Sequence, residues 1–452
     1  MRRAPSIFAV VALVLAGLSI GPSAHSQQGP TTALDDTSRH EAVEAVAAAL
    51  RNRYIFPDIG EQAAQAIEAA LEDGSYDDLD QRAAFAARLT EDLQAVARDK
   101  HLRVSAPGTP SAPAGGAGGA PPPERPRAEG GVTRADIIDS DVGYIEIIGF
   151  PPPFQFNGPA DRALAALQDT RALIIDIRRN GGGSPESVSR LVSYFLDSDE
   201  PVQINTFVNR TPDTTTFTTR EFWSETTPFS YAGKPVYVLT SGFTFSGGEE
   251  FAYDMQVMDL AELVGDTTGG GANPGGTMPI APGLVMFVPG GRAENPITGT
   301  NWEGVGVIPD VAVPSADAFR VALEELGVSP ALADIDAASG SRVFEPAPPR
   351  TEPQPGAEAA IRRISAELAR GEPDYELLTP QMAEVARTQL PVLTERLTSL
   401  GAVETVTFVE VAPNGGDVYD VEYANGGLRW MIALDAEGRA AGIGFQPLPG
   451  QP

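Results

Sequence analysis

The sequence predicts a mixed α/β protein with a largely parallel central sheet, an N-terminal helical bundle and a C-terminal α+β part. Three patterns lead to this prediction. Apolar residues recur at three- and four-residue spacing over residues 36–103, as in helices. Strand-like apolar runs alternate with helical stretches over residues 132–327, which is typical of a parallel sheet. Helical stretches followed by alternating strands occupy residues 357–445.

The helical bundle is expected at residues 31–104. Val46 and Leu50 recur at helical spacing, and Pro57 interrupts the pattern because proline cannot continue a helix. The central domain is expected at residues 132–330. Within it, strands are predicted at 142–148, 172–177 and 236–239, and helices at 160–168, 186–196 and 249–258.

Two segments rich in proline and glycine, residues 105–131 and 331–356, separate these parts. Such a composition cannot bury a core, so both are predicted to be linkers. The C-terminal α+β domain is expected at residues 357–452. Its helices are predicted at 357–370 and 379–400, and its strands at 403–411, 417–423, 428–434 and 442–445.

The composition excludes several kinds of function. The 452 residues carry 61 acidic and 32 basic side chains, a formal net charge of −29. A surface this negative repels phosphate backbones and anionic lipid, so no nucleic-acid partner is expected. The chain has no cysteine, which excludes disulfides, thiolate metal sites and cysteine nucleophiles. Its three histidines are too few for a histidine-rich metal site, and no cofactor is expected.

The N-terminus has the pattern of a secretory signal peptide. Arg2 and Arg3 precede an apolar run at residues 7–20, and residues 24–26 offer a cleavage site with small flanking residues. The run is shorter than the roughly 20 apolar residues of a membrane span. We therefore expect a signal peptide at residues 1–26 and a periplasmic or secreted mature protein. Its removal takes away two positive charges and no negative ones, so the charge becomes −31.

A first candidate site follows the buried strand that ends at Ile177. In the segment N-G-G-G-S-P, Ser184 suits a helix cap and Pro185 suits the first helical position. The glycines at 181–183 let the backbone approach a ligand and offer amide donors to a developing oxyanion. The alternative is a tight turn without function. A nucleotide-binding loop is not expected, since neither common phosphate motif is present.

A second candidate is the segment T-S-G-F-T-F-S-G-G-E-E at residues 240–250. A strand leads into a turn of small residues, and a helix leaves it. Ser246 would lie at the helix N-terminus, where partial positive charge and free amides favour a nucleophile. The pattern is close to the G-x-S-x-G turn, with Thr244 in place of the first glycine. The alternative is a serine that only caps the helix.

A serine nucleophile needs a base. After signal cleavage His40 and His101 remain, and both precede Ser246, which excludes the Ser…acid…His order of α/β-hydrolases. His101 follows a helical segment and could be exposed by a turn, whereas His40 is expected on the surface. Glu303, beside glycines, could orient an imidazole. The alternatives are a structural histidine and an ordinary loop acid.

As an ordered set, these segments resemble the tail-specific (C-terminal processing) serine proteases. The branch that they resemble is that of the tricorn core and interphotoreceptor retinoid-binding protein. The shared features are D-x-R-x-N-G-G-G at 176–183, T-x-S-G-G-E at 244–249 and G-V-x-P-D at 306–310. Y-I-F-P-D at 54–58 and D-K-H-L at 99–102 resemble the N-terminal domain of that branch.

The resemblance implies a role for each matching residue. Ser246 takes the nucleophile position, His101 that of the general base and Glu303 that of the acid that orients it. The amide of Gly247, with one amide of Gly181, Gly182 or Gly183, would form the oxyanion hole. For residues 132–330 the resemblance implies a crotonase-like or ClpP-like catalytic domain.

The chain also departs from the family. Members with a Ser/Lys dyad carry lysine in a G-K-G turn, where residues 269–272 here read G-G-G-A. The serine that precedes the histidine in the tricorn type is Lys100. No PDZ segment is recognisable, and residues 357–452 look more like a cystatin-like module.

These observations lead to an exported serine-type peptidase that acts on a peptide or protein substrate through a Ser-His-Glu triad and an acyl-enzyme. The alternative is a non-catalytic protein that binds apolar ligands or peptides on the same scaffold, since fold does not fix function. A third reading is a scaffold whose C-terminal module binds a partner. The sequence predicts no oligomeric state.

Overall fold

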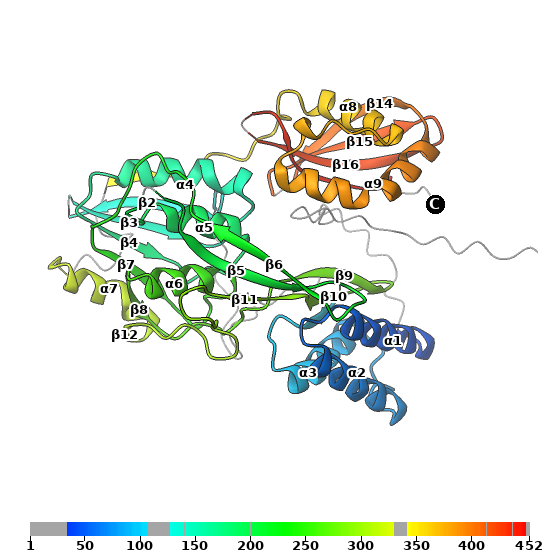
Figure 1. Cartoon of the computed structure of the whole chain (residues 1–452), viewed down its shortest axis with the longest axis horizontal. Helices are drawn as coiled ribbons and strands as arrows, with labels where there is room; N and C mark the ends of the chain where they lie inside the picture. The colour runs from blue at the N-terminus through cyan, green and yellow to red at the C-terminus, as the bar shows by residue number, and fades with distance from the viewer. Residues whose placement is uncertain are drawn as a thin grey trace, which may run out of the picture. The chain divides into compact units, whose positions relative to one another are not determined.

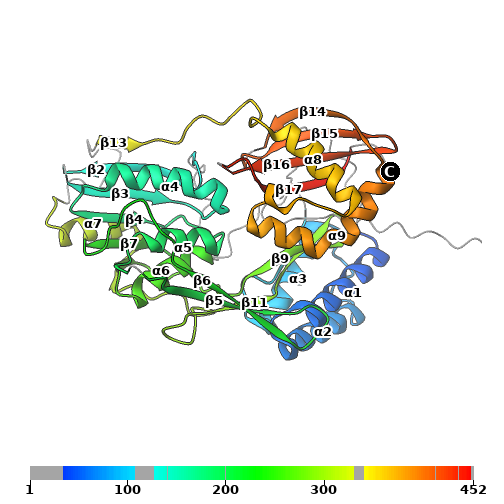
Figure 2. The ribbon, with the colours of Figure 1, turned by 45° about the horizontal axis from the view of Figure 1, so that its top comes forward.

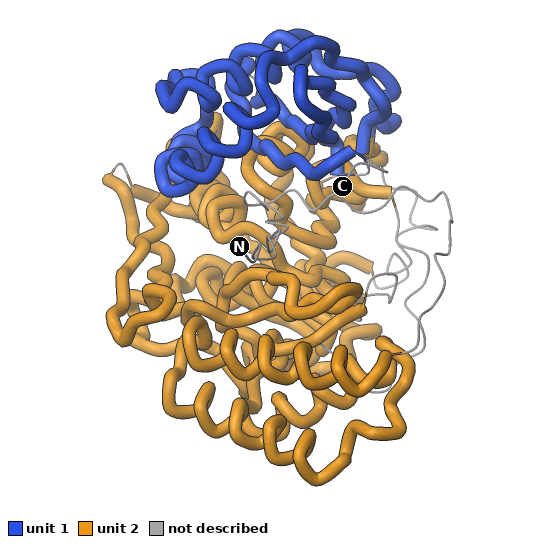
Figure 3. The backbone as a smooth tube through the Cα atoms, turned by 90° about the vertical axis from the view of Figure 1, so that its right-hand side faces the viewer, with its two compact units in different colours: residues 1–28, 347–452 blue, residues 29–346 orange. Residues whose placement is uncertain are grey.

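The computed structural model describes residues 34–106, 127–139, 141–198, 200–329, 341–412, 414–435 and 437–448. They belong to two compact units, one within residues 29–346 and one within residues 347–452, coloured orange and blue in Figure 3. The expected signal peptide at 1–26 and most of the predicted linker at 105–131 lie outside the described residues. None of the helices described in these ranges has the length and apolar character needed to cross a membrane.

The first unit is built around a seven-stranded sheet, with strand order β12-β8-β7-β4-β3-β2-β13. The neighbours from β12 to β3 are parallel, and β2 and β13 join antiparallel, so the predicted largely parallel sheet is confirmed. The strands are β2 Val132–Ile138, β3 Val142–Ile147, β4 Ala172–Asp176, β7 Val236–Thr240, β8 Glu262–Gly265, β12 Val311–Ala312 and β13 Ser341–Phe344.

Helices cover both faces of this sheet (Figures 1 and 2). Alternate residues of β4 point to opposite faces: Leu173 and Ile175 pack in one apolar cluster, and Ile174 packs in another. Helices α4, α5 and α6 contribute to the first cluster and α7 to the second. They span α4 Pro153–Leu167, α5 Pro185–Ser193, α6 Gly247–Val257 and α7 Ser315–Glu325. Helix α4 begins earlier than predicted, with a proline in its first turn, where proline is favourable.

The N-terminal helices are α1 Asp36–Arg53, α2 Pro57–Glu72 and α3 Arg82–Ala97, as their periodicity predicts. Their core is completed by a distant hairpin, β9 Gly275–Ala281 and β10 Leu284–Pro289, which contributes Leu284, Met286 and Val288. Strand β1, Arg103–Ser105, follows the helices and pairs antiparallel with β10. This pairing fixes the segment that ends at Leu102 against the hairpin.

A second small sheet was not predicted from the sequence. It has the order β11-β5-β6, and its pairs are antiparallel. Its strands are β5 Gln203–Arg210, β6 Phe217–Trp223 and β11 Gly291–Glu294.

The second unit has its own core and an antiparallel sheet of order β14-β15-β16-β17. Ile361 and Leu397 from the helices pack with Trp430 of the sheet. The elements are α8 Ala357–Arg370, the 3-10 turn Tyr375–Leu377, α9 Pro380–Leu400, β14 Val403–Val411, β15 Asp417–Tyr423, β16 Gly426–Leu434 and β17 Ala440–Pro447. This arrangement agrees with the α+β prediction.

Candidate active site

Ser246 lies in the turn between β7 and α6, immediately before the helix. Its backbone has φ 53° and ψ −122°, a conformation that residues other than glycine rarely adopt. The turn is fixed from below, since Thr244 Oγ1 donates to the Ile177 carbonyl at 2.9 Å and the Phe245 amide donates to the Asn180 carbonyl at 3.0 Å. The half-buried Ser246 side chain is therefore held at the helix N-terminus at the cost of local strain.

Glu249, in the first turn of α6, connects this turn to the loop that follows β8. Its fully buried carboxylate accepts from the Ser246 amide at 2.9 Å and from the Gly271 amide at 2.8 Å. It also accepts from the Thr268 hydroxyl at 2.5 Å and the Gly270 amide at 2.6 Å. Burial raises the pKa of Glu249 to about 6 against these donors. Glu249 therefore holds the serine turn against the loop at residues 268–271.

The glycine loop after β4 packs directly onto the serine turn. Asn180 orders the loop, because its side-chain amide donates to the Ile147 carbonyl at 3.0 Å and its oxygen accepts from the Gly182 amide at 2.8 Å. Gly182 has φ +99°, and a Cβ there would lie 2.8 Å from Ser246 Cβ. A Cβ on Gly247 would lie 2.9 Å from the Gly183 nitrogen. The loop and the turn therefore touch backbone to backbone.

The amides around this contact differ in what they bind. Those of Gly247 and Gly183 have no hydrogen-bond acceptor among the residues that the structure describes, whereas the Gly182 amide is bound to Asn180. The Gly181 amide also has no acceptor within the described ranges, but a Cβ on Gly181 would meet nothing within 4 Å. Gly183 and Gly247 are thus the pair of unbound amides that lie side by side next to Ser246.

His101 is placed by the segment between α3 and β1. Its ring lies between Phe245, with the ring centroids 4.6 Å apart, and Phe287 of β10, at 5.7 Å. Burial lowers the pKa of His101 to about 3, and the positive charge of Arg103 acts in the same direction, so the ring is neutral at pH 7. Ser246 is the neighbour of Phe245 in the chain. No hydrogen bond within the described ranges joins the Ser246 hydroxyl to the ring.

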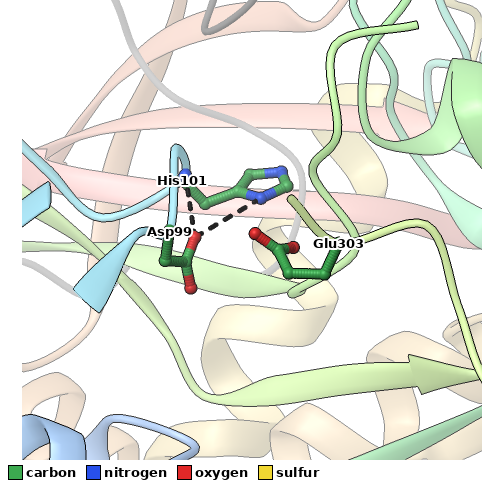
Figure 4. A group of neighbouring side chains, drawn as sticks. All are labelled: Asp99, His101 and Glu303. Carbon is green, nitrogen blue, oxygen red and sulfur yellow. Dashed lines mark hydrogen bonds and ion pairs between the residues drawn. The ribbon is translucent and has the colours of Figure 1, made fainter. Parts of the chain in front are cut away.

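Two acids, Asp99 and Glu303, lie beside the imidazole (Figure 4). One atom of each of the three side chains lies within 4.8 Å of the other two, and Asp99 Oδ1 is 4.0 Å from His101 Nδ1. Burial and, to a smaller extent, the charge of Asp99 raise the pKa of Glu303 to about 8. The structure thus brings His101 and Glu303 together, as the sequence predicts, and adds Asp99. The sequence placed Asp99 in the D-K-H-L segment but gave it no role.

The same three side chains form the one set, among the described residues, with spacing that a metal ion could bridge. Asp99 Oδ2 already accepts from the Tyr54 hydroxyl at 3.1 Å and from the Asn273 amide at 2.9 Å, and Oδ1 accepts from the His101 amide at 2.9 Å. Few lone pairs remain for a metal, so the group is better suited to orient an imidazole.

The two departures from the family motif meet at one loop, residues 269–272. Lys100 Nζ donates to the Gly269 carbonyl at 2.5 Å, and the Ala272 amide donates to Glu303 Oε2 at 2.5 Å. Since this loop also holds Glu249, it supports both the serine turn and the acid of the histidine through backbone amides. His40, by contrast, is exposed on α1, and its ring nitrogen contacts the Asp36 carbonyl.

Two segments of the chain match models of known protein families. Residues 141–313 match the model of peptidase family S41, and residues 36–134 match the N-terminal domain of Peptidase_S41 in eukaryotic IRBP. Three solved structures illustrate the similarity. A candidate peptidase from Parabacteroides merdae is 19% identical with a TM-score of 0.47, over 65% of this chain and 97% of its own. The photosystem II D1 C-terminal processing protease is 16% identical with a TM-score of 0.41, over 62% and 94%. The tricorn protease is 13% identical with a TM-score of 0.38, over 65% and 36%.

The two matched segments follow one another along the chain and contain the sequence motifs described above. Residues 36–134 include the D-K-H-L segment, and residues 141–313 include the glycine loop, the serine turn and Glu303. The chain therefore carries a peptidase family S41 domain at residues 141–313, preceded by the N-terminal domain of that family at residues 36–134.

Proposed function

We propose that this protein is an exported serine-type peptidase with Ser246 as its nucleophile. The observation that carries the proposal is the strained serine at the N-terminus of α6, flanked by the unbound amides of Gly247 and Gly183. A serine that only caps a helix would need neither the strain nor a second loop packed against it. The signal-peptide pattern at residues 1–26 supports export.

In the proposed reaction, Ser246 Oγ attacks the carbonyl carbon of the scissile peptide bond while His101 Nε2 takes the hydroxyl proton. The carbonyl oxygen becomes an oxyanion and accepts hydrogen bonds from the amides of Gly247 and Gly183. His101 then gives its proton to the leaving amine as the C–N bond breaks. A water molecule, deprotonated by the same imidazole, hydrolyses the ester and restores Ser246.

The charges around His101 fit this cycle. The neutral ring can accept the hydroxyl proton as Ser246 attacks, and the Glu303 carboxyl group beside it orients the ring. Within the glycine loop we assign the second oxyanion donor to Gly183, because the Gly182 amide is bound to Asn180 and a Cβ on Gly181 would meet no atom of the serine turn within 4 Å.

The proposal is tested by labelling the purified protein with a fluorophosphonate probe, which reacts with activated serines. We expect labelling of the wild-type protein and its loss in Ser246→Ala and in His101→Ala. Ser184→Ala is the matched control, since Ser184 also precedes a helix next to the glycine loop, yet it has an ordinary backbone conformation. We expect that control to be labelled like the wild type.

Equal labelling of Ser246→Ala and wild type would contradict the assignment of the nucleophile. A folded wild-type protein that neither reacts with the probe nor cleaves any member of a peptide library would contradict the peptidase. Apolar ligands would then be titrated, as the carrier alternative requires.

A further inference from the structure

We propose that Asp99 is a second positioning acid of the site. It orients the His101 ring and, together with Glu303, stabilises the positive charge that the ring acquires. This inference rests on the peptidase function proposed above and deepens it. The peptidase proposal gives the histidine one acid, whereas the structure places two beside it (Figure 4).

The first argument is the geometry at His101. Asp99 is 2% exposed, and its Oδ1 accepts the amide of His101 itself at 2.9 Å while lying 4.0 Å from the ring nitrogen Nδ1. The acid and the imidazole therefore belong to one short turn and move together. Nδ1 is buried and has no hydrogen-bond partner among the described residues, so the nearest carboxylate oxygen is its natural acceptor. A proton held on Nδ1 leaves Nε2 as the acceptor for the serine hydroxyl.

The second argument is how firmly each acid is held. Asp99 is anchored on its far oxygen by the Tyr54 hydroxyl and the Asn273 amide. Glu303 has one such donor, the Ala272 amide, and its Oε1 is buried without a partner among the described residues. With the His101 amide, Asp99 has three donors, and three donors favour the ionised form of a carboxylate more than one donor does. Asp99 is therefore the better-placed carrier of the fixed negative charge.

The third argument is the charge balance of the cluster. The ionisable groups that face the imidazole and its acids are Tyr54, Asp99, Lys100, Arg103, Glu249 and Glu303. Burial raises the pKa of Asp99, and its donors oppose this, whereas Glu303 is raised to about 8. Two neighbouring buried carboxylates do not both ionise readily. In the resting site Glu303 holds a proton and Asp99 carries the negative charge, so the imidazolium formed during attack meets a carboxylate already in place.

The experiment compares Asp99→Asn with the wild type in two measurements. The first is the fluorophosphonate reaction, which separates the maximal labelling rate from the half-saturating probe concentration. We expect the maximal rate to fall about 10- to 100-fold, less than the roughly 10⁴-fold loss when a lone triad acid is replaced. The half-saturating concentration should change less than about twofold, and Asp99→Glu should recover part of the rate.

The second measurement is NMR of protein labelled with ¹⁵N at histidine. The chain has three histidines, so His101→Ala identifies the His101 signals. We expect the Nδ1–H tautomer in the wild type and a mixture of tautomers in Asp99→Asn. Asp92→Asn is the matched control, since Asp92 also accepts a buried tyrosine hydroxyl, from Tyr76 at 2.8 Å, without an imidazole beside it. The control should leave both readouts unchanged.

A second pair of variants covers the case in which Asp99→Asn does not fold. Tyr54→Phe keeps Asp99 but removes one of its anchors, and Tyr76→Phe is its counterpart at Asp92. Tyr54→Phe should lower the maximal labelling rate about threefold or more and alter the His101 signals, and Tyr76→Phe should do neither.

The role of Asp99 would be overturned if Asp99→Asn and Tyr54→Phe both kept the wild-type labelling rate and tautomer of His101, while Glu303→Gln lowered the rate and changed the tautomer. The peptidase proposal fails separately, if Ser246→Ala reacts like the wild type whatever residue stands at position 99.

Discussion

Gly182 has no room for a side chain, because its missing Cβ would lie 2.8 Å from Ser246 Cβ and 2.9 Å from the Gly247 nitrogen. Its φ of +99° is also unfavourable for any other residue. We expect Gly182→Ala to displace the serine turn and to lower the labelling rate by about 10²-fold or more, the loss typical of one oxyanion donor.

The control for that substitution is Gly276→Ala in β9. A Cβ there would meet nothing within 4 Å, and the φ of Gly276 lies outside the left-handed region. We expect the Gly276 variant to react like the wild type. Equal rates for the two variants would show that the contact between the glycine loop and Ser246 is dispensable.

The sequence draws attention to the proposed catalytic residues but not to the residues that support them. Ser246 and the glycine loop stand out because small residues between a strand and a helix are uncommon without a reason. Tyr54 and Asp99 lie in the Y-I-F-P-D and D-K-H-L segments, but their roles could not be predicted there. Like the role of Asn273, they come from contacts between segments far apart in the chain. The available signal was the acid two positions before His101, which gains meaning only when the fold shows what surrounds it.

Besides Glu249, helix α6 carries two further buried acids, one turn apart. Glu250 accepts from the Asn205 amide at 3.0 Å, and Asp254 accepts from the Asn295 amide at 2.9 Å. Burial and, to a smaller extent, the charge of Glu186 raise the pKa of Glu250 to about 8, from about 4.5 in an unfolded chain. As pH rises from 4.5 to 8, the unfolded state therefore loses this proton first, and the free energy of unfolding falls.

Glu250→Gln removes that titration. Between pH 5 and pH 8 we expect the wild type to lose about 2–4 kcal/mol more unfolding free energy than the variant, as measured by urea denaturation at both pH values. Glu324→Gln on the exposed surface of α7 is the control, and its free energy of unfolding should change between pH 5 and pH 8 as that of the wild type does. A Glu250→Gln protein with the same pH dependence as the wild type would show that Glu250 is ionised in the folded state.

The elements found from the sequence and those missed differ in burial. Strands β3 and β4 are buried along their whole length, so they read as continuous apolar runs. Strand β6 is exposed at every residue but Phe222, and its three aromatic residues do not alternate regularly with polar ones. Strand β1 is three residues long and becomes a strand by pairing with β10, from a distant part of the chain. Local patterns cannot predict such pairing, yet it positions the histidine.

Each of the two units has a core of its own. In the unit within residues 347–452, Trp430 is fully buried, donates to the Tyr423 hydroxyl at 3.0 Å and packs against Phe445. The residues named for the proposed reaction all lie in the unit within residues 29–346. A unit with its own core and sheet is expected to fold alone.

We therefore expect a chain that ends at residue 346 to keep its fluorophosphonate labelling, and the fragment 347–452 to fold by itself. Trp430 is the only tryptophan in that fragment, so its blue-shifted emission should shift to the red in one cooperative urea transition. The transition should match that of Trp430 in the full chain carrying Trp223→Phe and Trp302→Phe. Loss of labelling from a truncated chain whose circular dichroism shows it folded would mean that the C-terminal unit takes part in the reaction. A fragment without a cooperative transition would mean that its core depends on the rest of the protein.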